Sequence, residues 1–164
     1  MNFIEIYDDA LSSEKCDELI DYFNNNPKMK GVVGGNMIVP SKKKSTELKN
    51  SVFSLHQLPF QLISSTLQEY TDKYVKKYSP LKHMEKWGVD DGFTLKKFEG
   101  EDEGFKSWHT EHCMTFPKRL LVWMFYLNDA QSGTEFHYYP NIESKKGRLV
   151  IWPAGWTHFH KGVT

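Results

Sequence analysis

Regularly spaced apolar residues predict three elements in the first half of the chain. Residues 3–7 alternate apolar and polar side chains, which is typical of a short strand. Residues 13–23 place apolar side chains at helical spacing behind two serines that can cap a helix, and the pattern ends before Pro27. Residues 60–78 repeat apolar positions every three or four residues, and we expect an amphipathic helix there that covers a sheet.

The pattern changes after Trp87, where aromatic and β-branched segments are separated by turn residues, as in FTLKKF, RLLVWMFYLND and RLVIWPAGW. Such segments are typical of antiparallel β-structure. We therefore expect residues 1–164 to form a single α+β domain that is mainly β with flanking helices. The helices of residues 1–85 are predicted to pack on a sheet formed by residues 93–164.

Residues 28–50 lie between the two predicted helices and are rich in Lys, Gly and Ser without sustained periodicity. This composition favours an irregular, mobile connection. The triplet Lys42-Lys43-Lys44 within it is interpreted as part of a solvated loop, with an anionic partner as the alternative.

Composition restricts the class of protein without naming a function. The chain has 164 residues and 39% hydrophobic residues, enough for a packed core, and its 21 Lys+Arg balance 21 Asp+Glu. Zero net charge argues against a general nucleic-acid binder. The longest apolar stretch, residues 120–127, is too short to cross a membrane, and the acidic start lacks a secretion signal, so we expect a cytoplasmic protein. Cys16 and Cys113 are expected to be reduced.

The most informative residues for chemistry are His109 and Glu111. In a strand, residues two apart point to the same face, so these side chains can present an imidazole and a carboxylate together. Either His158 or His160 can supply a third ligand from a distant segment. Two His and one carboxylate on one face of an octahedron hold divalent iron and leave three positions open. Alone, a His beside a Glu is more often a surface pair than a metal site.

Several ordered motifs carry a resemblance to a known family. They are KKFEGEDEGFKSWHTE, an apolar segment that starts at Arg119 and ends in YLND, the element Gly133-Thr134-Glu135-Phe136, and GRLVIWPAGWTHFHKG. In this order they resemble the Fe(II)- and 2-oxoglutarate-dependent dioxygenases, in particular the prolyl 4-hydroxylase-like group with its small bacterial and phage members. The resemblance spans residues 93–162.

The resemblance implies a fold, a metal and a reaction. The family fold is a double-stranded β-helix, or jelly roll, whose mouth holds the iron. The family's distal ligand precedes a glycine as H-x-G, so the resemblance favours His160 over the alternative His158. The catalytic metal ligands are then His109, Glu111 and His160, with Fe(II), 2-oxoglutarate and O2 as cofactor and cosubstrates. Retention of a carboxylate at Glu111, where the family commonly has Asp, implies hydroxylation rather than halogenation.

The resemblance also implies a Lys or Arg beyond the distal His that pairs with the far carboxylate of 2-oxoglutarate. The sequence stops at Thr164, so we expect the β-helix core to lack its last strand. The alternatives are that Arg119, Lys161 or Arg148 replaces this base, or that the protein does not turn over.

Two aromatic residues complete the predicted cosubstrate pocket. Phe98 occupies the place of a family tyrosine that often contacts 2-oxoglutarate but has no hydroxyl, so Tyr126 is the better hydrogen-bonding candidate. Core packing is the alternative role for both. With Arg119, they form the predicted 2-oxoglutarate-binding set.

The resemblance implies hydroxylation of a prolyl residue in a protein or peptide. One alternative is the same reaction on a free small molecule or amino acid, and another is a non-catalytic, cupin-like module that binds a small ligand. Residues 28–50 are a candidate substrate-covering loop, since such loops are commonly rich in Gly and mobile.

Overall fold

The computed structural model describes residues 1–33, 36–51, 56–89, 92–114 and 116–163. The chain is mixed α+β, with two α-helices, two short 3-10 helices and antiparallel strands. In chain order the elements are β1 (Glu5–Tyr7), α1 (Ser13–Asn25), β2 (Met29–Lys30), β3 (Lys43–Lys44), β4 (Thr46–Asn50), α2 (Leu58–Lys77), η3 (Ser79–His83), β5 (Phe93–Lys97), β6 (Gly104–Phe105), β7 (Leu121–Phe125), β8 (Ala130–Phe136), β9 (Ile142–Ser144), β10 (Leu149–Pro153), η4 (Trp156–His158) and β11 (His160–Val163).

Both predicted helices are present. The Ser12 hydroxyl caps α1 by accepting a hydrogen bond from the backbone N–H of Lys15, and α1 ends at Asn25, before Pro27. Helix α2 begins with Pro59 in its first turn, where a missing N–H costs no helical hydrogen bond. Within the described parts of the chain, no helix is long and apolar enough to cross a membrane.

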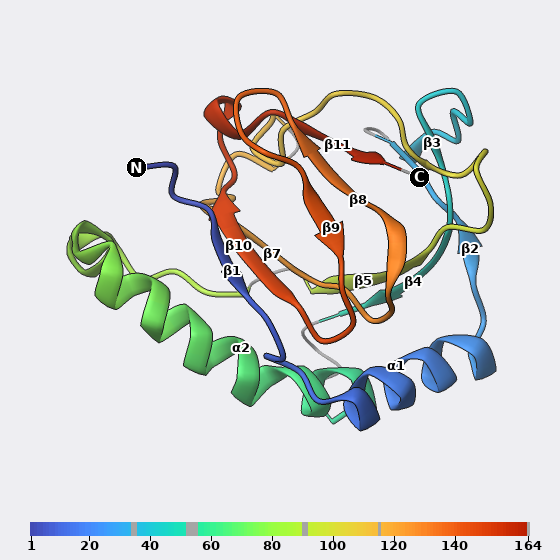
Figure 1. The fold of residues 1–164 in the computed structure, drawn as a ribbon, viewed down its shortest axis with the longest axis horizontal. Helices are drawn as coiled ribbons and strands as arrows, with labels where there is room; N and C mark the ends of the chain where they lie inside the picture. Colours follow the sequence, from blue (N-terminus) through green and yellow to red (C-terminus); the bar gives the residue numbers. More distant parts are fainter. Residues whose placement is uncertain (34–35, 52–55, 90–91, 115, 164) are drawn as a thin grey trace.

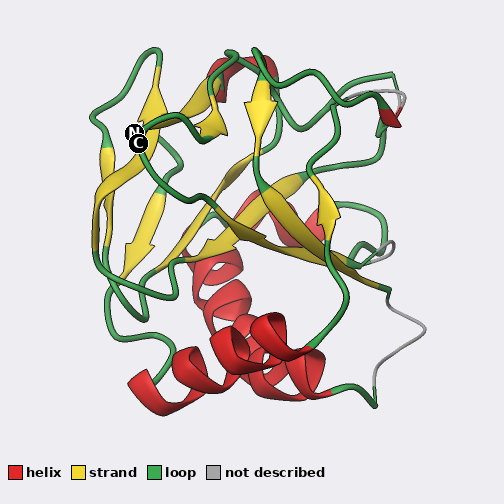
Figure 2. Cartoon of the chain, turned by 90° about the vertical axis from the view of Figure 1, so that its right-hand side faces the viewer, coloured by secondary structure: helices red, strands yellow, loops and turns green. Residues whose placement is uncertain are grey.

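Two three-stranded antiparallel sheets, β1-β10-β7 and β11-β8-β9, enclose part of the core. Strand β10 lies between two apolar layers, because Leu149 and Ile151 pack with residues of α2 while Val150 and Trp152 pack with residues of β8 and β9. The two helices lie together on one side of the strands (Figures 1 and 2). The prediction that helices from the first half cover strands from the second half is therefore confirmed.

The first half also contributes strands, which the sequence did not predict at residues 43–50. Strand β4 lies between β2 and β5 in a third sheet, and β3 pairs with β6. Lys43 and Glu47 are buried and form an ion pair, while Leu48 faces Leu95 across the sheet. The prediction of an irregular connection is wrong for residues 43–50. Because the charges of Lys43 and Glu47 neutralise each other, this lysine-rich segment can be buried as strands.

Candidate metal centre

Three side chains from the described part of the chain converge on one point. His109, Glu111 and His160 each offer a ligand atom, and these atoms lie within 4.8 Å of one another. His109 Nε2 is 3.6 Å from Glu111 Oε1, and the centroids of the two imidazole rings are 4.4 Å apart. His160 is buried, and the other two side chains are half-buried. The cluster is therefore buried on the side of His160 and partly accessible to solvent on the side of His109 and Glu111.

The backbone brings these residues together through one isolated β-bridge. The His109 N–H donates to the carbonyl of His160 at 2.9 Å, and the His160 N–H donates to the carbonyl of His109 at 3.0 Å. Thr110 then donates its hydroxyl to the carbonyl of Ala154 at 2.5 Å, and the N–H of His112 donates to the same carbonyl. Residues 109–111 therefore form a single β-bridge and a turn in place of the expected strand. The side chains of His109 and Glu111 are nevertheless close together, as predicted.

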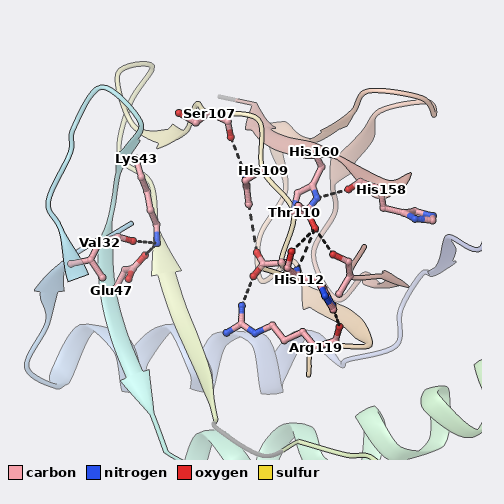
Figure 3. Close-up of polar contacts among 12 residues, drawn as sticks. Val32, Lys43, Glu47, Ser107, His109, Thr110, His112, Arg119, His158 and His160 are labelled. Carbon is pink, nitrogen blue, oxygen red and sulfur yellow. Dashed lines mark hydrogen bonds and ion pairs between the residues drawn. The ribbon is translucent and has the colours of Figure 1, made fainter. Parts of the chain in front are cut away.

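Hydrogen bonds to backbone carbonyls orient both imidazoles. His109 Nδ1 lies 2.9 Å from the carbonyl of Ser107, and His160 Nδ1 lies 2.8 Å from the carbonyl of His158 (Figure 3). A carbonyl only accepts, so each Nδ1 carries a proton, and Nε2 is the ring nitrogen whose lone pair is available to a metal once that nitrogen has no proton. A carbonyl partner on the second ring nitrogen is the usual support of a metal-binding histidine.

Electrostatics set the protonation states of His160 and Glu111. Burial, and to a smaller extent the neighbouring His109, lowers the pKa of His160 to about 4. Burial acts to raise the pKa of Glu111, but the neighbouring His109 and the charges of Lys96 and Arg119 outweigh it and hold the pKa at about 2. At neutral pH, His160 is therefore a neutral donor and Glu111 is an anion.

The three residues predicted to bind 2-oxoglutarate lie in different surroundings. Arg119 Nη1 is 2.5 Å from Glu111 Oε2, so its guanidinium contacts the cluster itself. The Tyr126 hydroxyl is 2.7 Å from Thr134 Oγ1, between the two sheets, and burial raises the pKa of this tyrosine to about 12. Phe98 is 41% exposed. Their role toward a cosubstrate stays a prediction.

His158, the alternative distal ligand, lies outside the cluster. It is 2% exposed, its Nε2 is 2.8 Å from the carbonyl of Asn2, and its Nδ1 is 2.9 Å from the hydroxyl of Thr157. Its ring also stacks on Tyr139. His158 ends the helical turn η4, whereas His160 begins β11, so the two do not share the face that a continuous strand would give them.

Aromatic rings surround the cluster, and the sequence did not indicate that Phe105 and Lys43 lie on this side of it. The ring of Phe105 stacks on His109, and the Lys43 ammonium lies over Phe105. Trp152 is 2% exposed, and its Nε1–H has no hydrogen-bond partner among the described residues. The only sequence signal for Phe105 is its position four residues before His109.

Comparisons with solved structures find the same architecture. A viral collagen prolyl hydroxylase from Paramecium bursaria Chlorella virus-1, solved as a 2OG complex, matches with a TM-score of 0.67 and 18% identity over 99% of this chain and 88% of its own. A Trichoplax adhaerens prolyl hydroxylase, in complex with a hypoxia inducible factor peptide, matches with a TM-score of 0.77 and 14% identity over 99% of this chain and 78% of its own.

A Pseudomonas putida prolyl-4-hydroxylase matches with a TM-score of 0.71 and 10% identity over 100% of this chain and 86% of its own. Neither protein-family models nor curated protein sequences match. The resemblance that the sequence motifs carry is therefore confirmed at the level of the fold, which the chain shares with prolyl hydroxylases of viral, animal and bacterial origin.

Proposed function

We propose that the protein is an Fe(II)- and 2-oxoglutarate-dependent dioxygenase that hydroxylates an unactivated C–H bond. The observation that carries this proposal is the convergence of His109, Glu111 and His160, whose ligand atoms lie within 4.8 Å of one another in a chain with a prolyl hydroxylase fold. We assign these three residues as the metal ligands and His160 as the distal histidine.

The donor set fits divalent iron. Two neutral imidazoles and one carboxylate form the facial set that is diagnostic of non-haem Fe(II) oxygenases, and they leave three positions for other ligands. A zinc site of structural type would be closed by a fourth protein ligand. The described residues form only this one group of three or more His, Cys, Asp or Glu side chains suited to a metal.

Polar groups between the two sheets support binding of a cosubstrate there. The Tyr126 hydroxyl is partly buried and lies 2.7 Å from Thr134 Oγ1, and the buried Trp152 Nε1–H has no acceptor within the described part of the chain. A buried donor without a partner is uncommon and favours a bound acceptor. We propose that Tyr126 contacts 2-oxoglutarate, while Phe98 and Arg119 stay predictions for this pocket.

Each ligand residue has a defined task in this reaction. When bound, iron would use 2-oxoglutarate and O2 to supply the oxidising chemistry that replaces C–H by C–OH. His109 and His160 would hold the metal through Nε2, while the carbonyls of Ser107 and His158 orient the two rings. Glu111 supplies the negative charge, and the open side of the cluster admits the substrate.

The fold proposal is a double-stranded β-helix built from the antiparallel sheets. Among the described strands, β5 pairs only with β4, and β7 pairs only with β10, so each has one open edge. The rings of Phe93 on β5 and Trp123 on β7 are 5.8 Å apart. We propose that one further strand of the β-helix pairs between these two edges.

For the substrate we propose a prolyl residue in a protein or peptide. The Trichoplax structure contains a peptide fragment, and the viral and bacterial structures are prolyl hydroxylases. A free amino acid or other small molecule is the alternative substrate class. A cupin-like module without turnover is the alternative from another functional class.

The test is formation of succinate from 2-oxoglutarate by the protein with Fe(II) and O2, with and without proline-rich peptides. We expect peptide-stimulated succinate formation that His109→Ala, Glu111→Ala and His160→Ala each abolish. His137→Ala is the matched control, because His137 is exposed and lies outside the cluster. Succinate formation stimulated only by small molecules supports the alternative substrate class. No succinate under any condition, with ligand binding retained, supports the cupin-like module.

A further inference from the structure

An aromatic ring and a buried cation hold His109 from the side of β3 and β6. The ring of Phe105 is stacked on the imidazole of His109, with centroids 3.6 Å apart and planes at 13°. The ammonium of Lys43 lies 5.2 Å from the centroid of the same phenyl ring. Phe105 and Lys43 are also paired partners in the β3–β6 ladder. The ring that contacts His109 is therefore fixed by both backbone pairing and a cation.

Lys43 is itself held rigidly. Its Nζ is 2.5 Å from Glu47 Oε1 and 3.2 Å from the carbonyl of Val32 (Figure 3). Lys43 is 6% exposed and Glu47 is 2% exposed. An exposed lysine would sample many rotamers, whereas this ammonium has one position beside Phe105.

A second pair of the same kind holds Glu111 from the opposite end of the ligand segment. The guanidinium carbon of Arg119 lies 3.7 Å from the centroid of Phe116, and Arg119 Nη1 lies 2.5 Å from Glu111 Oε2. The other oxygen, Glu111 Oε1, is the one that lies 3.6 Å from His109 Nε2. Arg119 thus occupies one carboxylate oxygen and leaves the other directed at the imidazole.

We propose that Phe105 and Arg119 are positioning residues of the metal site: Phe105 fixes the plane of the His109 ring, and Arg119 makes Glu111 a ligand through one oxygen. This inference rests on the metal site of the proposed function. The need for such support follows from the backbone, because His109 and Glu111 lie outside regular strands, where the bridge to His160 and the turn at Thr110 hold the chain. Glu also has one more rotatable bond than Asp, so an unsupported Glu111 would lose more freedom when it binds a metal.

Geometry and charge make opposite predictions for Arg119. The positive charge of Arg119 repels a bound metal cation. If this repulsion were the main effect of Arg119, its removal would strengthen metal binding. A positioning Arg119 strengthens it, and loss of such partners of a ligand typically costs about 10- to 100-fold in metal affinity. Arg119→Lys separates the two effects, because it keeps the charge and loses the planar fork.

The experiment is an anaerobic titration of the full chain with Co(II), without 2-oxoglutarate, followed by the visible absorption of the bound ion. Co(II) replaces Fe(II) as the probe because its spectrum reports coordination geometry as well as occupancy. The variants are Phe105→Leu, Phe105→Tyr, Arg119→Met and Arg119→Lys. Lys73→Met is the matched control, because Lys73 forms a cation–aromatic pair with Tyr70 on α2, 4.0 Å from the ring centroid.

We expect Phe105→Leu, Arg119→Met and Arg119→Lys each to weaken Co(II) binding about 10- to 100-fold and to change the spectrum of the bound ion. Phe105→Tyr keeps the ring, so its affinity and spectrum should match those of the wild type and of Lys73→Met. A circular dichroism spectrum identical to that of the wild type shows for each variant that the loss is local.

Two results overturn the inference while the proposed function stands. One is wild-type affinity and spectrum in Phe105→Leu and both Arg119 variants. The other is tighter binding by Arg119→Met together with unchanged binding by Arg119→Lys, which would make Arg119 a competitor for the carboxylate. Absence of Co(II) and Fe(II) binding by the wild type overturns the proposed metal site itself, and this inference with it.

Discussion

The buried ion pair of Lys43 and Glu47 gives a quantitative test of how residues 43–50 enter the fold. Lys43 Nζ is 2.5 Å from Glu47 Oε1, and the two side chains are 6% and 2% exposed. Burial lowers the pKa of Lys43, and the charge of Lys96 lowers it further, more than Glu47 raises it. The pair therefore does not offset the burial of the ammonium and its repulsion by Lys96 in full, and buried ion pairs commonly carry such a desolvation cost.

Replacement of one partner leaves the other charge buried. In Lys43→Met, the carboxylate of Glu47 keeps the hydroxyl of Ser45, 3.1 Å away, as its hydrogen-bond donor. Breaking a buried pair in this way costs about 3–5 kcal/mol of the free energy of unfolding. For a domain of this size, that corresponds to a fall in Tm of roughly 6–20 °C. Replacement of both partners, in Lys43→Met/Glu47→Leu, should restore the stability to the wild-type value or above.

The assay is equilibrium unfolding in urea, followed by far-ultraviolet circular dichroism, for the wild type and both variants. Lys73→Met is the control, because Lys73 forms an exposed pair with Glu69 and its loss should leave the stability close to that of the wild type. If Lys43→Met were as stable as the wild type, the argument that the Glu47 carboxylate is destabilising when it is buried without its partner would be refuted. A double variant as unstable as the single one would show that packing, rather than charge, causes the loss.

Three further predictions concern the core, the N-terminal segment and pH. Leu149→Ala removes a fully buried side chain and should lower the free energy of unfolding by about 2–5 kcal/mol in the same assay. His158→Ala leaves the carbonyl of Asn2 without its partner and should destabilise the fold by about 1–3 kcal/mol, while Fe(II) affinity in an anaerobic titration stays unchanged. Because the pKa of His160 is lowered from 6.5 to about 4, its stabilising contribution is fully present above pH 6.5 and is lost as the pH falls toward 4. Urea unfolding at pH 7 and pH 4 should show this loss, roughly 3 kcal/mol, in the wild type and not in His160→Gln; an equal loss in the variant would contradict it.

The sequence predicts elements well where the signal is local. The periodicity of residues 60–78 corresponds to α2, and the capping serine before residue 13 corresponds to the start of α1. Both signals depend on side chains within one or two helical turns of one another. Strand β4 was missed because its partner β5 is distant in sequence and its buried charges look like those of a solvated loop.

The same distinction applies to the candidate site. Residue types and spacing indicated His109 and Glu111, and the family resemblance favoured His160 over the alternative His158. The positions of the two histidines depend on η4, a turn of 3-10 helix that ends at His158 and separates it from the strand that begins at His160. The contacts of Phe105 with His109 also depend on pairing between distant segments, so no local pattern predicts them.

The most direct test of the central claim is the amount of Fe(II) that each chain binds under anaerobic conditions. We expect one Fe(II) for each wild-type chain and for each His137→Ala chain. We expect no stoichiometric Fe(II) binding by Glu111→Ala or His160→Ala, because each loses one of the three donors that lie within 4.8 Å of one another. Stoichiometric iron in both of these variants, or none in the wild type, would contradict the assignment of the metal site.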